Sequence, residues 1–453
     1  MTALFYLLGV VVFVVAILVS IGLHELGHMI PAKRFGGKVT QYFIGFGPTV
    51  WSKQVGETEY GVKAIPLGGY VKIVGMLPPG ADDLADEVTV DAEGNTVTRI
   101  RKSNTGMFTQ LISDARAAEW ELVKPEDSDR LFYKMASWKK VVVMAGGPTV
   151  NLLIAFFIFW GVFATYGQHS MEVAPGAPEV SSVNRCVLAF EDEGRKCKAD
   201  DPDAPAYEAG LRPGDVITSF NGTAVTSWDQ LRDLIRGNAD GDAVIGYTRK
   251  GQQLTGSTST TVEARPTSET DDTLRKVGFL GVAPETREVV ETGGPIYTLG
   301  QMGTMTVDTV KALGTLPVKV WGVAKAIVGV EERAEDSPVS IVGGGRIAGE
   351  TVSHDVLNVT EKTVFLLMLI AGFNLFIGLF NFLPLLPLDG GHIASALWEA
   401  TRRRLARLRG RPDPGYVDAA KLLPIAYVVA SAMLVMGVVL IVGDLVVPLH
   451  VQG

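Results

Sequence analysis

The chain has 453 residues, of which 47% are hydrophobic, and its formal net charge is −8 at pH 7. This length exceeds that of one ordinary domain, so we expect two or more folding units. The negative charge argues against nucleic acid as a partner, because phosphate binding needs a basic surface. The two cysteines, Cys186 and Cys197, form no CxxC pattern, which argues against a cysteine-ligated zinc site.

The first predicted element is an uncharged apolar stretch, Ala3–Leu23. It is long enough to cross a hydrocarbon core of about 30 Å as a helix. A cleaved signal peptide is the alternative, but the stretch is too long, has no basic start and is followed by no A-x-A-like site. We therefore predict a retained transmembrane helix.

The motif HELGH, His24 to His28, stands at the end of this helix. Residues four apart share a helix face, so both imidazoles can point at one ion, with Glu25 beside them to accept a proton from a metal-bound water. Charged residues at membrane depth cost roughly 2.5–3.5 kcal/mol each, so they persist where they are paired, metal-bound or hydrated. The alternative is a helix end whose histidines only form hydrogen bonds.

A stretch rich in glycine and β-forming residues follows the first helix. Its alternation and its turn residues, among them Gly68 and Gly69, predict paired strands that lie against the membrane interface. A polar insert from residue 78 to about 130 comes next. A second apolar stretch, Val141–Tyr166, then predicts the second transmembrane helix.

The long segment before the third apolar stretch predicts an α+β domain. The sequence AYEAGLRPGDVITSFNG indicates a short helix, a glycine turn, a strand and an Asn-Gly hairpin turn. The next segment predicts a helix, because Trp228, Leu231 and Ile235 share one helical face. Beyond about Glu285 the sequence is weakly amphipathic, which suits helices that lie on the outer leaflet.

The third apolar stretch, Val364–Leu388, leads directly into Asp389. A catalytic zinc ion needs a third protein ligand and an open position for water, and a carboxylate completes a pair of imidazoles well. His392 is a rival ligand, but Asp389 lies closer to the membrane-embedded part of the segment. Pro384 and Pro387 are expected to break the helix just before it.

Basic residues set the predicted orientation. Six lysines and arginines follow the first helix, and six arginines precede the fourth apolar stretch, Leu422–Gly443. Four helices would place both basic segments in the cytoplasm. Both termini and the long segment between the second and third helices would then lie outside. Oxidation is favoured there, so we expect a disulfide between Cys186 and Cys197, with two buried thiols as the alternative.

The motifs HELGH, GGPTVN and NFLPLLPLDGGH, in this order, resemble those of the site-2 protease family of intramembrane zinc metalloproteases. The segment AYEAGLRPGDVITSFNG resembles the PDZ domain that many bacterial members carry. Together these motifs span nearly the whole chain. The single PDZ-like domain and the cysteine pair make the chain most similar to the actinobacterial branch, whose members cut membrane-bound anti-sigma factors.

The resemblance implies a polytopic α-helical membrane protein with four transmembrane helices, a membrane-associated β-hairpin element and an extracytoplasmic α+β PDZ-like domain. The helices are expected at 1–30 with HExxH, 138–167, 361–400 with the LDG motif, and 422–448. The other segments are the β-element with its polar insert (31–137), the PDZ-like domain (175–285), an amphipathic region (286–360) and a basic cytoplasmic loop (401–421).

The family's ligands map onto His24, His28 and Asp389, which would hold one catalytic Zn²⁺, and its catalytic glutamate maps onto Glu25. Zinc would activate a water molecule as the nucleophile, with Glu25 as general base. The implied enzyme is an intramembrane endopeptidase of the bacterial cell membrane, with its active site near the cytoplasmic side. Its partners would be the bilayer and a single-pass substrate such as an anti-sigma factor, pre-trimmed by another protease.

Four further residues are candidates for substrate binding. Asn151 and Asn381 match asparagines of the family motifs and could satisfy backbone groups of the substrate, but helix–helix hydrogen bonds are an equal alternative. Gly68 and Gly69 lie in a segment that could receive an unwound substrate by β-addition. The PDZ-like region could either bind a peptide terminus or exclude substrates with bulky outer domains.

Two other classes of function compete with the protease. A metal transporter would also carry histidine and aspartate inside the membrane. A catalytically inert adaptor would use only the PDZ-like region. Glu25 in the HExxH arrangement and the large PDZ-like domain favour the protease over a transporter. The intact HELGH and LDG motifs count against the adaptor.

Overall fold

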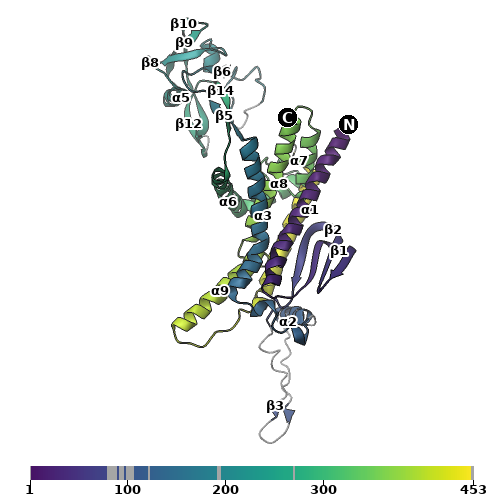
Figure 1. The fold of residues 1–453 in the computed structure, drawn as a ribbon. Helices are drawn as coiled ribbons and strands as arrows, with labels where there is room; N and C mark the ends of the chain where they lie inside the picture. Colours follow the sequence, from purple (N-terminus) through teal and green to yellow (C-terminus); the bar gives the residue numbers. More distant parts are fainter. Residues whose placement is uncertain are drawn as a thin grey trace. The chain divides into compact units, whose positions relative to one another are not determined.

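The computed structural model describes most of the chain, and about half of the predicted polar insert lies outside the described residues. The described ranges are 2–78, 89–90, 96–97, 107–120, 123–190, 195–268 and 271–449. The chain divides into two compact units (Figure 1). Unit 1 comprises Met1–Tyr166 and Gly293–Gly453, and unit 2 comprises Gly167–Thr292.

Four helices in the described residues are long and apolar enough to cross a membrane. Three of them are α1 (Thr2–Arg34), α3 (Ser137–Thr165) and α8 (Val359–Asn381), and the fourth span, Ala419–Val446, contains α10 (Leu423–Val446). All four are hydrophobic around most of their circumference, which suits lipid-facing helices. The predicted multi-pass, α-helical fold class is confirmed.

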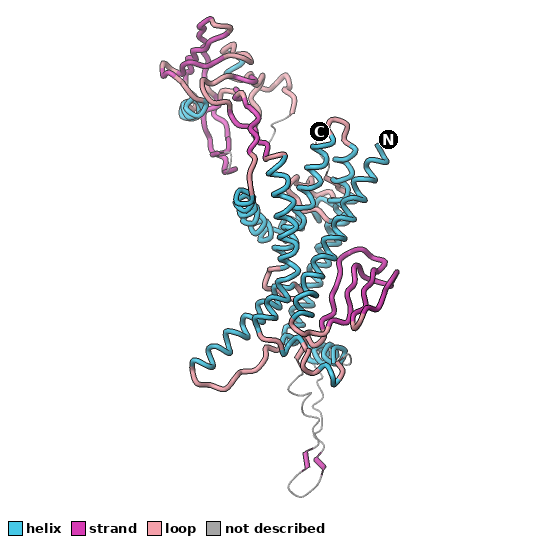
Figure 2. Tube along the Cα trace, in the orientation of Figure 1, coloured by secondary structure: helices cyan, strands magenta, loops and turns pink. Residues whose placement is uncertain are grey.

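A β-hairpin follows α1 (Figure 2). Its strands, β1 (Val39–Val55) and β2 (Thr58–Ile73), pair antiparallel. Tyr42 pairs with both Val71 and Tyr60, so the two long strands bend and the first half of β1 lies between two parts of β2. The Tyr42 hydroxyl donates a hydrogen bond of 2.7 Å to the Gly22 carbonyl, which joins this small sheet to α1.

Unit 1 also contains helices that are too polar or too short to count as spans. After the hairpin in the sequence come the short strands β3 (Thr89–Val90) and β4 (Thr96–Val97), which pair with each other, and helix α2 (Met107–Trp120). After unit 2 come α6 (Pro295–Ile327), α7 (Ile341–Ser353) and, beyond α8, α9 (Asp389–Leu408). Helix α7 packs on α1, and Phe13, Ile17 and Ala348 form a buried cluster with Ile370 of α8.

The helix breaks before Asp389, as Pro384 and Pro387 predict. Helix α8 ends at Asn381, before the apolar stretch ends at Leu388, and a new helix, α9, begins at Asp389. Pro384 and Pro387 lie between the two helices, where neither can donate a backbone hydrogen bond to continue the helix. Helix α9 then runs to Leu408, so the first part of the predicted basic loop is helical.

Unit 2 is an α+β unit with its own buried core. A four-stranded antiparallel sheet in the order β10-β9-β7-β8 packs against α5, whose buried Leu231 and Ile235 face Ile217 and Ile245. The predicted Asn-Gly turn joins β7 to β8, with Asn221 in the left-handed region at φ 48°. Three further strand pairs complete the unit: β11 with β12, β13 with β6, and β14 with β5.

The remaining bounds of unit 2 are as follows. The helices are α4 (Pro205–Glu208) and α5 (Trp228–Gly237), and the strands are β5 (Gln168–Val173), β6 (Val180–Val183), β7 (Val216–Phe220), β8 (Thr223–Ala224), β9 (Asp242–Arg249), β10 (Gln252–Ser259), β11 (Thr261–Ser268), β12 (Asp271–Phe279), β13 (Val282–Pro284) and β14 (Thr286–Glu291). A disulfide joins Cys186 to Cys197.

Candidate metal centre

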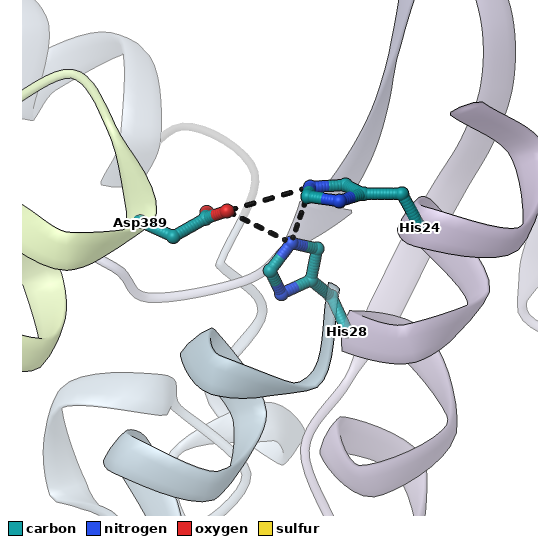
Figure 3. A group of neighbouring side chains, drawn as sticks. All are labelled: His24, His28 and Asp389. Atoms are coloured by element: carbon teal, nitrogen blue, oxygen red, sulfur yellow. Dashed lines mark hydrogen bonds and ion pairs between the residues drawn. The ribbon is translucent and has the colours of Figure 1, made fainter. Parts of the chain in front are cut away.

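Two histidines of α1 and one aspartate of α9 meet inside unit 1 (Figure 3). His24 and His28 are buried one turn apart on α1, and their Nε2 atoms are 3.2 Å apart. Asp389, the first residue of α9, places its Oδ2 atom 3.4 Å from His24 Nε2 and 3.3 Å from His28 Nε2. Among the described residues, no other group of three histidine, cysteine or acidic side chains is placed to hold a metal ion.

The three donor atoms fit a zinc ion in chemistry and in spacing. Two imidazole nitrogens and one carboxylate oxygen are a ligand set of catalytic zinc sites. Ligands held tetrahedrally at about 2.0–2.1 Å from one ion lie about 3.3–3.4 Å from each other. The triangle of His24, His28 and Asp389 has edges of 3.2–3.4 Å. Two imidazole nitrogens with lone pairs aimed at one point repel each other unless a cation lies between them.

A backbone carbonyl of α3 orients one of the histidines. His28 Nδ1 lies 2.9 Å from the Val143 carbonyl oxygen. Because a carbonyl can only accept, Nδ1 carries the proton and Nε2 presents its lone pair to the triangle. His24 Nδ1 is buried and has no hydrogen-bond partner among the described residues. The two histidines are therefore oriented differently. A hydrogen bond to α3 orients His28, whereas packing alone orients His24 among the described residues.

Glycines of α1 and α3 make room for the two imidazoles. Gly27 and Gly146 bring the two helix backbones together: a Cβ on Gly27 would lie 2.5 Å from the Gly146 carbonyl oxygen. A Cβ on Gly147 would overlap His28 Nε2 and lie 2.7 Å from His24 Nε2. The two glycines of the GGPTVN motif in α3 therefore allow the close approach of α1 and leave room for the two imidazoles.

A cavity of about 610 Å³ opens beside the triangle. Buried Glu25 lines it, as do all four residues predicted to bind substrate and the rival ligand His392: the lining includes Gly68, Gly69, Asn151, Asn381 and His392. The structure therefore brings the predicted site residues of four separate segments together. His392 belongs to the cavity but not to the triangle of possible metal ligands.

The hairpin forms one wall of this cavity. A Cβ on Gly69 would lie 3.1 Å from Glu25 Cγ, so the backbone of β2 passes directly over the glutamate. Burial, together with the neighbouring Glu25 carboxylate, raises the pKa of Tyr42 to about 12. Its hydroxyl therefore stays protonated and keeps donating to the Gly22 carbonyl.

Two asparagines near the site are buried with one oxygen atom unpaired. Asn151 Oδ1 and Asn374 Oδ1 have no hydrogen-bond partner among the described residues. The Asn374 amide group donates to Ser20 Oγ at 3.1 Å and to the Ile370 carbonyl at 2.8 Å. Sequence reasoning singled out Asn151 but missed Asn374, Ser20 and the Val143 carbonyl. An asparagine at the centre of an apolar span was the available signal for Asn374.

Comparisons with known proteins agree with this geometry. The profile of peptidase family M50 matches residues 12–421. "Zinc metalloprotease Rip1" of Mycobacterium tuberculosis is 34% identical over 98% of this chain and 99% of its own. "Regulator of sigma-W protease RasP" of Bacillus subtilis is 24% identical over 87% of this chain and 90% of its own.

One solved structure is also similar: the PDZ domain of an SdrC-like protein from Listeria monocytogenes is 18% identical, covers 25% of this chain and 92% of that chain, and gives a TM-score of 0.16. The profile match spans most of the sequence, and the relative at 34% identity aligns from end to end. The chain therefore belongs to peptidase family M50, the site-2 protease family of zinc metalloproteases.

Proposed function

We propose that this protein hydrolyses a peptide bond in or near the transmembrane segment of single-pass membrane proteins. The observation that carries the proposal is the triangle of His24, His28 and Asp389 beside Glu25, in a cavity of a unit that contains four apolar spans. Anti-sigma factors are the proposed substrate class. A relative whose name is "Regulator of sigma-W protease" supports this choice.

Each polar side chain of the site has a distinct role in this proposal. His24, His28 and Asp389 hold one zinc ion, which, when bound, makes water more acidic and polarises the peptide carbonyl. Glu25 takes the proton from the attacking water and passes it to the departing amine. Glu25 is buried and lines the same cavity as the three proposed ligands.

A helical substrate must unwind before its backbone can be attacked, because its peptide groups are already hydrogen-bonded to each other. We propose that the end of β2 at Gly68 and Gly69 receives the unwound strand by β-addition. Both glycines line the cavity over Glu25. Asn151, whose buried Oδ1 has no partner among the described residues, is placed to accept a hydrogen bond from a substrate N–H.

The proposed setting is the bacterial cell membrane, with both termini and unit 2 outside and the zinc site near the cytoplasmic side. The basic residues after α1 and at the end of α9 support this orientation. The disulfide in unit 2 also supports it, because disulfides persist outside the cytoplasm. The substrate would first be trimmed by another protease.

The test uses purified full-length protein and a single-pass substrate in lipid. Glu25→Gln should lower the cleavage rate by roughly 10²–10⁴-fold, because it removes the general base, and should leave zinc bound. Glu332→Gln, at an exposed position far along the chain, is the matched control and should cleave at the wild-type rate. Undiminished cleavage by Glu25→Gln contradicts the mechanism, and metal flux without any cleavage favours a transporter.

A further inference from the structure

A buried ion pair joins two of the helices that build the metal centre. Lys140 of α3 places its Nζ atom 3.0 and 2.8 Å from the two carboxylate oxygens of Glu399 on α9. The two side chains are only 7% and 2% exposed. Taking two charges out of water is costly, so a pair of this kind needs a full set of hydrogen bonds to persist.

Further donors complete the hydrogen bonding of the Glu399 carboxylate. Ser137 Oγ donates to one oxygen at 3.1 Å, and the Val417 backbone N–H donates to the other at 3.2 Å. Arg403, one turn further along α9, lies 3.5 Å away. The start of α3, the middle of α9 and the chain before α10 therefore converge on one carboxylate.

Helices α3 and α9, which this ion pair joins, each also carry a part of the metal centre. On α3, the Val143 carbonyl lies one turn beyond Lys140 and accepts the hydrogen bond from His28 Nδ1. On α9, Asp389 is the first residue and Glu399 lies about 15 Å further along the same rigid helix. The break between α8 and α9 leaves the start of α9 without a continuous helix to fix its position. The Lys140–Glu399 ion pair between α3 and α9 therefore sets the position of Asp389 relative to His28.

We propose that Lys140 and Glu399 are positioning residues for the zinc site: their ion pair holds the Asp389 carboxylate at ligand distance from the two imidazoles. Neither side chain belongs to the triangle of possible metal ligands, and both act through the helices that carry them. This inference rests on the proposed zinc site. It differs from that proposal because it assigns zinc affinity to two residues outside the ligand set.

A second buried ion pair provides a matched control. Arg333 and Asp444 are 4% and 2% exposed and lie 2.8 Å apart. Asp444 also accepts hydrogen bonds from the backbone N–H groups of Ser340 and Gly343, so it joins α10 to the start of α7. None of these residues belongs to the triangle of possible metal ligands. Breaking this pair should destabilise unit 1 without moving a zinc ligand.

The experiment compares zinc affinity in the full-length protein reconstituted in lipid, by competition with a chelator. Glu399→Gln should weaken zinc binding by roughly 10–100-fold, the usual effect of losing a residue that supports a metal ligand. Asp444→Asn should keep the wild-type affinity, and thermal unfolding of the zinc-free proteins should show that both variants are folded.

The outcomes separate this inference from the zinc site itself. Wild-type affinity in Glu399→Gln, or an equal loss in Asp444→Asn, overturns the positioning role. Undiminished affinity in Asp389→Ala instead overturns the proposed ligand set. If Glu399→Gln does not fold, Ser137→Ala removes only one of the hydrogen bonds to Glu399. It should give a smaller loss of zinc affinity, and an unchanged affinity counts against the proposal.

Discussion

Each unit of the chain holds a carboxylate against nitrogen atoms, but the two carboxylates differ in their surroundings. In unit 2, fully buried Asp215 accepts two hydrogen bonds of 2.8 Å from Arg249 and one of 2.7 Å from the Arg212 N–H. In unit 1, Asp389 Oδ2 faces two imidazole nitrogens beside a cavity. The carboxylate with a full set of N–H donors stabilises a fold, whereas the one that lies within 3.4 Å of two imidazole nitrogens has a geometry suited to a shared cation.

Polar side chains near Asp389 also lack a full set of hydrogen-bond partners among the described residues. Around Asp389, buried polar atoms such as His24 Nδ1 and Asn151 Oδ1 have no partner in the described part of the chain. Buried unpaired polar atoms cost free energy, so a fold retains them mainly where a ligand or water completes them. We therefore expect substitutions beside the triangle of His24, His28 and Asp389 to change metal binding, and those around Asp215 to change only stability.

The largest effect is expected at Gly147. Gly147→Ala would place a methyl group on the two ligating nitrogens, so it should abolish stoichiometric zinc binding and cost about 1–3 kcal/mol from overpacking. Zinc content by atomic spectroscopy and thermal unfolding check this result. Gly161→Ala, in the same helix with open space around it, is the matched control. It should keep zinc and gain about 0.5–1 kcal/mol. A Gly147→Ala protein with full zinc content contradicts the proposed site.

A smaller effect, on stability alone, is expected in unit 2. Asp215→Asn should cost on the order of 2 kcal/mol, below the value for a fully buried pair because the Arg249 side chain is 25% exposed. Hydrogen exchange of the amides in β7 and β9, measured in the full-length protein, reports this free energy. Zinc affinity should not change. A loss of zinc affinity in this variant would contradict the expectation that Asp215 affects only stability.

The free energy of unfolding of Asp215→Asn, relative to the wild type, should also depend on pH. Burial raises the pKa of the Asp215 carboxyl, but the hydrogen bonds from Arg249 and Arg212 outweigh it, so the pKa lies below its usual value. A lowered folded-state pKa adds stability that is present above the unfolded value of about 3.9 and is lost as the pH falls through the folded value. The stability difference between wild type and Asp215→Asn should therefore shrink in acid.

The four spans and the grouping of His24, His28 and Asp389 could be predicted from the sequence, because they depend on apolar length, helical spacing and position at the end of a span. Apolar length locates a transmembrane helix, and the spacing of His24 and His28 places both on one helix face. Asp389 followed from its place at the end of the third apolar stretch. The Asn-Gly turn at Asn221 and the helix around Leu231 followed in the same way.

The residues that support the site could not be predicted, because their roles depend on contacts between distant segments. The Val143 carbonyl leaves no trace in the side-chain sequence, and Lys140 with Glu399 are 259 residues apart. Pro384 and Pro387 predicted a break before Asp389, but the exact end of α8 at Asn381 was not predicted, because apolar residues continue to Leu388. The packing of α7 on α1 was also not predicted, because it becomes visible only in three dimensions.

We propose that residues from α1 and α9 together bind one zinc ion. The zinc content of purified full-length protein, wild type against Asp389→Ala, tests this binding. We expect one zinc per wild-type chain and, after chelator treatment that leaves the wild type loaded, little zinc in a folded Asp389→Ala protein. One zinc per chain in Asp389→Ala, retained as firmly as in the wild type, would contradict it.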